Sequence, residues 1–137
     1  MKRTAILIAV LTLLVMSGFQ GCVIDDGDVQ PGDARAKFLG EWKVNEDCSR
    51  GNYIAKIKAD EGNSSQVLIE NFGNPGPNYD DAVGVVAGNA ISVGVQNIGE
   101  GWTVSGYGNY NTDGSITWSY TLIITGYTED CTAQFTP

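Results

Sequence analysis

Eight short strand-like segments, in most of which apolar and polar residues alternate, constrain this chain more than any other feature of its sequence. In the clearest one, residues 116–124, the alternate positions are Ile116, Trp118, Tyr120, Leu122 and Ile124. A period of two residues indicates a strand with one buried face. We expect strands at residues 42–48, 53–59, 66–72, 81–87, 90–96, 102–110, 116–124 and 129–135. We expect only one helical turn, at residues 33–39, with Asp33 as its N-cap.

Turn signals between these segments favour antiparallel neighbours. Gly88-Asn89 and Asp113-Gly114 are dipeptides typical of hairpins, and residues 73–78 are the strongest loop signal in the chain. Glycines inside the expected strands permit the bends that closure of a sheet requires; they are Gly84, Gly94, Gly106 and Gly108. We therefore predict an all-β fold of about eight short antiparallel strands that form a small up-and-down barrel, with a β-sandwich as the alternative.

The first 21 residues have the form of a secretory signal peptide. Lys2 and Arg3 precede an apolar run at residues 5–16, and small residues follow it. The run is shorter than the ~20 apolar residues that a membrane-spanning helix needs. Residues 22–36 contain several acids together with Gly and Pro, which is typical of a flexible tether. This leaves residues 37–137 for the barrel domain.

The end of this signal resembles the lipobox of bacterial lipoproteins, because Gly21 directly precedes Cys22. In that family, cleavage occurs before the cysteine, which then carries the lipid. The resemblance implies palmitate at Cys22 and a protein that is lipid-anchored to the outer membrane, either periplasmic or surface-exposed. Plain secretion, with Cys22 free or paired, is the alternative.

The two remaining cysteines, Cys48 and Cys131, form an even pair if Cys22 carries a lipid. Disulfides persist in oxidising compartments outside the cytoplasm, so an exported chain favours a Cys48–Cys131 bridge. Two reduced, buried thiols are the alternative. A bridge would tie the first expected strand to the last, as closure of a barrel requires.

The charge of the chain argues against two classes of partner. The formal net charge is −8, all 16 acidic residues lie after residue 22, and no basic residue follows Lys58. A nucleic-acid-binding protein needs a basic face to neutralise phosphates. Anionic membrane surfaces also attract Lys and Arg. We therefore expect contact with a membrane only through the N-terminal lipid, and no nucleic acid as a partner.

The beginning of the domain adds a second resemblance. Gly40-x-Trp42, after a short N-terminal turn, is similar to the Gly-x-Trp that opens lipocalin barrels. The order of lipobox, acidic tether, F-L-G-x-W strand and late cysteine resembles small lipocalin-like lipoproteins of Gram-negative bacteria. This resemblance implies an up-and-down barrel that binds a small apolar molecule or a protein partner.

Few residues are suited to catalysis. The chain has no histidine, which excludes Ser-His-Asp and Cys-His catalysis and histidine metal sites. Adjacent acids such as Asp80-Asp81 and Glu129-Asp130 lack the ligand order of a calcium-binding EF-hand. We expect neither an enzyme nor a cofactor or metal site.

Glu46 is the most unusual residue of the first expected strand, because it lies on the apolar face between Val44 and Cys48. An unpaired buried carboxylate is costly. Glu46 therefore lies at the barrel mouth, pairs with a residue such as Arg50 or Lys43, marks a bulge, or faces a ligand.

Four aromatic residues share the inner face of their strands and leave two possibilities open: Trp102, Tyr110, Trp118 and Tyr120. They either fill a small barrel or line a pocket at one mouth. A cavity beside Trp118 and Tyr120 would favour a small apolar ligand. A filled interior with an exposed apolar patch on the loops would favour a protein partner, or an envelope inhibitor or adhesion module that acts through loops such as residues 71–81.

Overall fold

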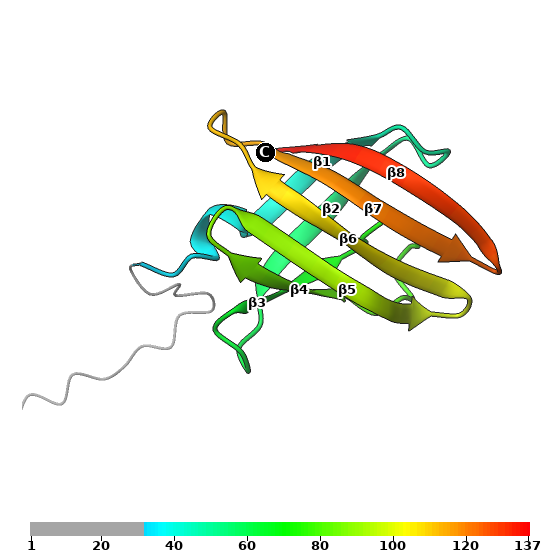
Figure 1. Ribbon diagram of the computed structural model, residues 1–137, viewed down its shortest axis with the longest axis horizontal. Coiled ribbons are helices and arrows are strands. Elements are labelled where there is room, and N and C mark those ends of the chain that lie inside the picture. Colours follow the sequence, from blue (N-terminus) through cyan, green and yellow to red (C-terminus); the bar gives the residue numbers. More distant parts are fainter. Residues whose placement is uncertain (1–31) are drawn as a thin grey trace, which may run out of the picture.

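A closed antiparallel barrel accounts for nearly all of the chain that the computed structural model describes, which is residues 32–137 (Figure 1). Its strands are β1 (Gly40–Glu46), β2 (Asn52–Ala59), β3 (Gln66–Glu70), β4 (Ala82–Ala87), β5 (Ala90–Gly99), β6 (Trp102–Tyr110), β7 (Ile116–Ile124) and β8 (Tyr127–Thr136). Each strand pairs with the next, and β8 pairs with β1. The predicted up-and-down barrel is confirmed, and the sandwich alternative is wrong.

Helical structure in residues 32–137 is confined to one 3₁₀ turn, η1 (Ala36–Phe38). No helix in this part of the chain has the length and apolar character needed to cross a membrane. The predicted helical turn is therefore present, but its cap differs. Arg35 is the N-cap residue and its side chain makes no capping bond, whereas Asp33 accepts the backbone N–H of Arg35 at 2.8 Å.

The strand boundaries follow the alternation closely where it is regular. β6 and β7 have the predicted bounds, whereas β5 continues to Gly99, past its predicted end. A shift in the β5–β6 register between Val93 and Gln96 breaks the two-residue period there. The Gln96 side chain compensates by bonding both the N–H and the C=O of Val83 at 2.8 Å, as a strand backbone would.

The two ends of the barrel are closed by different segments. At the proximal end, where the described chain begins, lie η1 and the loops at residues 60–65, 88–89 and 111–115. At the distal end lie the loops at residues 47–51, 71–81, 100–101 and 125–126. This division follows from the antiparallel order and is visible along the long axis of the molecule (Figure 1).

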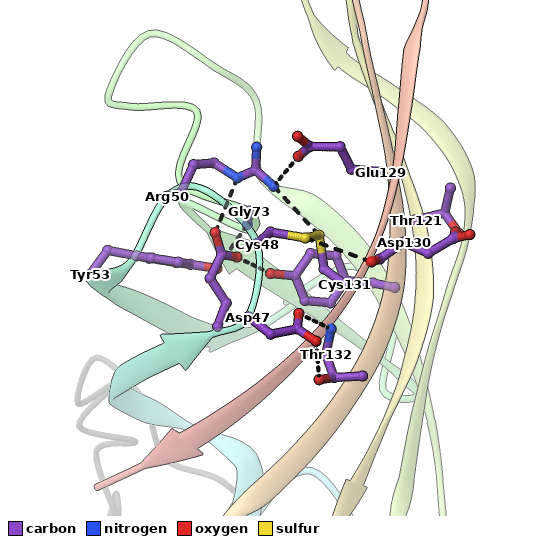
Figure 2. Close-up of a disulfide and its surroundings, with 12 residues drawn as sticks. Asp47, Cys48, Arg50, Tyr53, Gly73, Thr121, Glu129, Asp130, Cys131 and Thr132 are labelled. Carbon is purple, nitrogen blue, oxygen red and sulfur yellow. Dashed lines mark hydrogen bonds and ion pairs between the residues drawn. A yellow bond between two sulfur atoms is a disulfide. The ribbon is translucent and has the colours of Figure 1, made fainter.

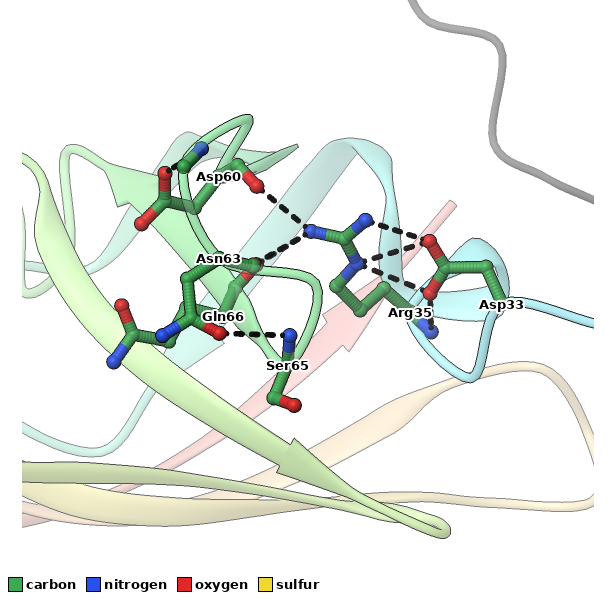
Figure 3. A network of polar contacts seen from close by, with 7 residues as sticks. Asp33, Arg35, Asp60, Asn63, Ser65 and Gln66 are labelled. Carbon is green, nitrogen blue, oxygen red and sulfur yellow. Dashed lines mark hydrogen bonds and ion pairs between the residues drawn. The ribbon is translucent and has the colours of Figure 1, made fainter.

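The proximal end is closed by the segment that leads into β1. Phe38 is fully buried, its ring lies 5.5 Å from that of Tyr110, and its carbonyl accepts the indole N–H of Trp42 at 2.8 Å. The Arg35 guanidinium is pinned between the Asp33 carboxylate and three carbonyl oxygens of the β2–β3 connection, those of Asp60, Asn63 and Gln66 (Figure 3). The folded unit therefore begins before residue 37, inside the predicted tether.

The β1–β8 seam closes the barrel. Its register runs from Lys43 opposite Thr136 to Glu46 opposite Ala133. Directly beyond it, Cys48 and Cys131 form the predicted disulfide, with Cα atoms 5.6 Å apart. The bridge joins residues 83 positions apart, for which the chain-entropy model gives about 4–5 kcal/mol of stabilisation.

Most glycines inside the strands have a different purpose from the one predicted. Gly84, Gly106 and Gly108 lie under the side chains of Ile91, Tyr120 and Trp118, where an added Cβ would clash. Only Gly94 lies at the β5 irregularity, and a Cβ there would meet nothing within 4 Å. The first three glycines therefore make room for large interior side chains.

We predict that Gly108→Ala destabilises the barrel, whereas Gly94→Ala does not. A Cβ at position 108 would lie 2.6 Å from the Trp118 ring, and overpacking of this kind costs about 1–3 kcal/mol. Urea unfolding of both variants measures the difference. Equal stability of the two variants would show that the Trp118 ring does not rest on the β6 backbone.

Candidate functional site

The four inward-facing aromatic residues pack against other rings. Trp118 is fully buried and Tyr120 nearly so, whereas Trp102 and Tyr110 are half-buried near opposite ends of the barrel. The Phe72 ring lies 4.9 Å from that of Trp118 and 5.0 Å from that of Tyr120. These contacts fill the middle of the barrel, where a ligand cavity would have to lie.

Glu46 is buried and is held by two partners. One carboxylate oxygen lies 3.1 Å from Arg50 Nε, and the other accepts the hydroxyl of Tyr120. Of the possibilities left open by the sequence, pairing with Arg50 is the one found. Each oxygen has a protein partner and the side chain is fully buried, so this carboxylate does not face a ligand in the described structure.

Arg50 connects Glu46 to the disulfide and to β8. Its guanidinium lies 2.7 Å from the Glu129 carboxylate and donates to Cys131 Sγ at 3.5 Å (Figure 2). It also lies 5.9 Å from the centre of the Trp102 ring. A planar guanidinium with several donors suits such a bridge. The cluster therefore joins both strands of the seam at the distal end.

Tyr120, which is buried, and Tyr53, which is half-buried, complete this cluster. The Tyr53 hydroxyl accepts the backbone N–H of Gly73 at 3.2 Å, and burial raises the pKa of Tyr53 well above its usual value. The pKa of Tyr120 is also raised, mainly by burial and then by the nearby Tyr53 and Glu46. Both phenols are therefore neutral at physiological pH.

The loop at residues 71–81, predicted as a candidate contact loop, packs as a lid over the distal end. Phe72 and Gly73 are buried, and Tyr79 packs against Trp102 with ring centres 5.5 Å apart. The Asn71 side chain donates to the carbonyl of Ile54 at 2.9 Å and accepts the N–H of Gly76 at 3.1 Å. None of the exposed large apolar side chains of residues 32–137 belongs to this loop.

One group of residues has the spacing of a metal site: Cys48, Glu129 and Cys131. Both sulfur atoms belong to the disulfide, so they are not available as thiolate ligands. Glu129 is already paired with Arg50. This arrangement fits a structural cluster better than a metal centre.

Two adjoining grooves lie on the outer face of the barrel. The larger, of about 460 Å³, is lined on β1, β2 and β8 by Lys43, Asn45, Asn52, Ile54 and Thr136, with Val44 and Tyr53 between them. The smaller, of about 240 Å³, is lined on β1, β8 and β7 by Asn45, Asp47, Thr117, Thr132 and Gln134, with Ala133. Asn45 is common to both grooves. Neither groove is lined by Trp118 or Tyr120.

A row of uncharged polar side chains crosses this face. Strand pairing places Asn52 beside Asn45, Asn45 beside Gln134, Gln134 beside Thr117, and Thr117 beside Asn109. We call these five residues the amide row. Its internal bond is from the Thr117 hydroxyl to Gln134 Oε1, at 3.2 Å. Within residues 32–137, the amides of Asn45 and Asn52 are exposed and have no hydrogen-bond partner.

The predicted lipid attachment site, Cys22, lies outside the described residues.

No protein-family model and no curated protein matches this chain. The sequence alone did not identify the amide row, because its members come from five strands and meet only through the register of four strand pairings. The signal that was present is the run of Asn, Gln, Ser and Thr at outward positions of β6, β7 and β8.

We predict that Glu46→Gln lowers stability more than Glu129→Gln. The first substitution replaces the buried carboxylate beside Arg50 with a neutral amide, and the loss of this charged partner costs about 1.5–3 kcal/mol. The Glu129 side chain is 38% exposed, and an exposed ion pair contributes about 1 kcal/mol or less. Denaturant unfolding under oxidising conditions, with the disulfide intact, measures both. A larger loss for Glu129→Gln would contradict the role given to Glu46.

Proposed function

We propose that this chain is a non-enzymatic, lipid-anchored protein of the bacterial envelope that binds its partner on the outer surface of the barrel. The observation that carries the proposal is the filled interior. Phe72, Trp118 and Phe135 are each 0–1% exposed, and the Trp118 ring packs edge-to-face against Phe72 and at a tilt against Phe135 in the centre of the barrel. A carrier of a small apolar molecule needs an apolar cavity of about 300 Å³ or more.

The outer grooves support binding at the surface. They are concave regions at which side chains of several strands converge, and within them the side-chain amides of Asn45 and Asn52 have no partner in the described structure. The alternative of loop-mediated inhibition or adhesion has less support, because the lid loop at residues 71–81 uses its apolar side chains to close the barrel.

The lipid anchor rests on the Gly21-Cys22 pair, and the disulfide fits an exported chain. Residues 23–31 separate Cys22 from the described part, which begins at the proximal end. An anchor at Cys22 would therefore hold the proximal end toward the membrane and leave the distal end and the outer face accessible.

Native mass spectrometry of the protein purified from its host membrane tests this proposal. The expected mass is that of a chain that begins at Cys22 and carries covalent lipid, with no apolar molecule retained in the barrel. The Cys22→Ser variant is the control, and it should lack the lipid mass. An unmodified Cys22 in a soluble protein would overturn the anchor, and a stoichiometric apolar ligand would overturn binding at the outer surface.

A further inference from the structure

We infer that the amide row binds a neutral oligosaccharide along the outer face of β2, β1, β8 and β7. This inference rests on the proposed function, because it names the ligand class of that outer surface. The row crosses both grooves, and Asn45 lies where they adjoin. An extended, polyhydroxylated chain lying across the strands would contact Asn52, Asn45, Gln134 and Thr117 in turn.

The chemistry of the row matches hydroxyl groups. Each Asn or Gln side chain offers two N–H donors and one carbonyl acceptor, and a hydroxyl both donates and accepts. Neighbouring hydroxyls on a sugar ring present the same mixed pattern at short spacing. Within the described structure, the side-chain donors and acceptors of Asn45 and Asn52 have no protein partner. Ile54, which is 51% exposed, offers an apolar contact for the C–H groups of a sugar ring.

The charges around the row favour an uncharged ligand. The two charged residues that line the grooves are already engaged: the Asp47 carboxylate accepts both the N–H and the hydroxyl of Thr132, and Lys43 Nζ donates to the Pro137 carbonyl at 3.3 Å. The hydrogen bond from the Thr132 N–H is the main reason that the pKa of Asp47 is lowered. The chain as a whole carries a net charge of −8, which repels acidic polymers.

The same outer face is different toward the proximal end of β2. There a charged row places Glu41, Lys56 and Glu70 side by side across β1, β2 and β3, and Lys58 lies 3.4 Å from Glu70 and 2.8 Å from Asp81. The amide row contains no charged residue, so it offers a ligand neutral donors and acceptors in place of ion pairs.

Other ligand classes fit the grooves less well. An apolar molecule would remove the free amides from water without replacing their hydrogen bonds. A protein partner is usually anchored by Trp, Tyr or Arg at the centre of its interface. Of these three residue types the grooves contain only Tyr53, which is half-buried and whose hydroxyl accepts the N–H of Gly73. A neutral saccharide supplies donors and acceptors at the density that the row requires.

The test uses the mature lipoprotein in phosphatidylcholine nanodiscs, which avoids detergents with sugar headgroups. Nuclear magnetic resonance of nitrogen-15-labelled protein observes the side-chain amides of Asn45, Asn52 and Gln134 directly. The probes are maltohexaose, cellohexaose, xylohexaose and mannohexaose, with hexagalacturonate as the acidic counterpart. We expect at least one neutral hexasaccharide to cause saturable shifts of these three side-chain amides, and hexagalacturonate to cause none.

Variants make the assignment specific. The double variant Asn45→Ala/Gln134→Ala should bind the active hexasaccharide about tenfold more weakly, since it loses hydrogen bonds from two side chains. Asn78→Ala, an exposed asparagine on the lid loop, is the matched control and should bind as the unmodified protein does. The dispersed backbone spectrum of each variant reports that the barrel is folded.

Several results would overturn the inference. They are the absence of shifts with all four neutral hexasaccharides, equal binding of hexagalacturonate, or unchanged affinity in the double variant. These results leave the proposed function standing, because the mass of the lipoprotein and the absence of an interior ligand test it separately. Saturable shifts confined to inward residues such as Ile57 and Leu122 would overturn both.

Discussion

The closure of β1 onto β8 is the interaction on which the rest of this structure depends. The paired part of the seam is short, from Lys43 to Glu46 on β1, and it would leave two long edges exposed if it opened. The disulfide and the Glu46–Arg50–Glu129 cluster reinforce it at the distal end. A covalent bond and a buried ion pair thus secure a contact between segments far apart in the sequence.

Closure also determines where a ligand can bind. Eight strands enclose an interior that is just wide enough for side chains, and here it is filled by aromatic rings from β7, β8 and the lid loop. Gly108 allows the ring of Trp118 to lie directly against β6, and Gly106 allows the β7 backbone and Cβ of Tyr120 to approach closely. In a barrel packed in this way, the binding site that we propose lies on the outside, where the amide row crosses the seam.

Much of the fold follows from local pattern, because strand alternation and hairpin turns act over a few residues. Regular strands such as β6 and β7 and the inward direction of Trp118 were predictable in this way. The Cys48–Cys131 pairing was predictable from the cysteine count of an exported chain. The β5 irregularity was not, since the Gln96 side chain replaces backbone pairing. The sequence predicted Asp33 as the N-cap of η1, but the N-cap residue is Arg35, and the Asp33 carboxylate binds the backbone N–H and the guanidinium of Arg35. The amide row depends on register across four pairings, which the sequence alone does not determine.

The most direct test of the central claim, that the interior is filled and the ligand site is external, is a crystal structure of the mature protein under xenon pressure. Xenon enters empty apolar cavities of about 150 Å³ in proteins. The account predicts no xenon between Phe72, Trp118 and Tyr120 inside the barrel. A xenon atom or an ordered apolar molecule beside Trp118 would contradict it and would restore the interior as the binding site.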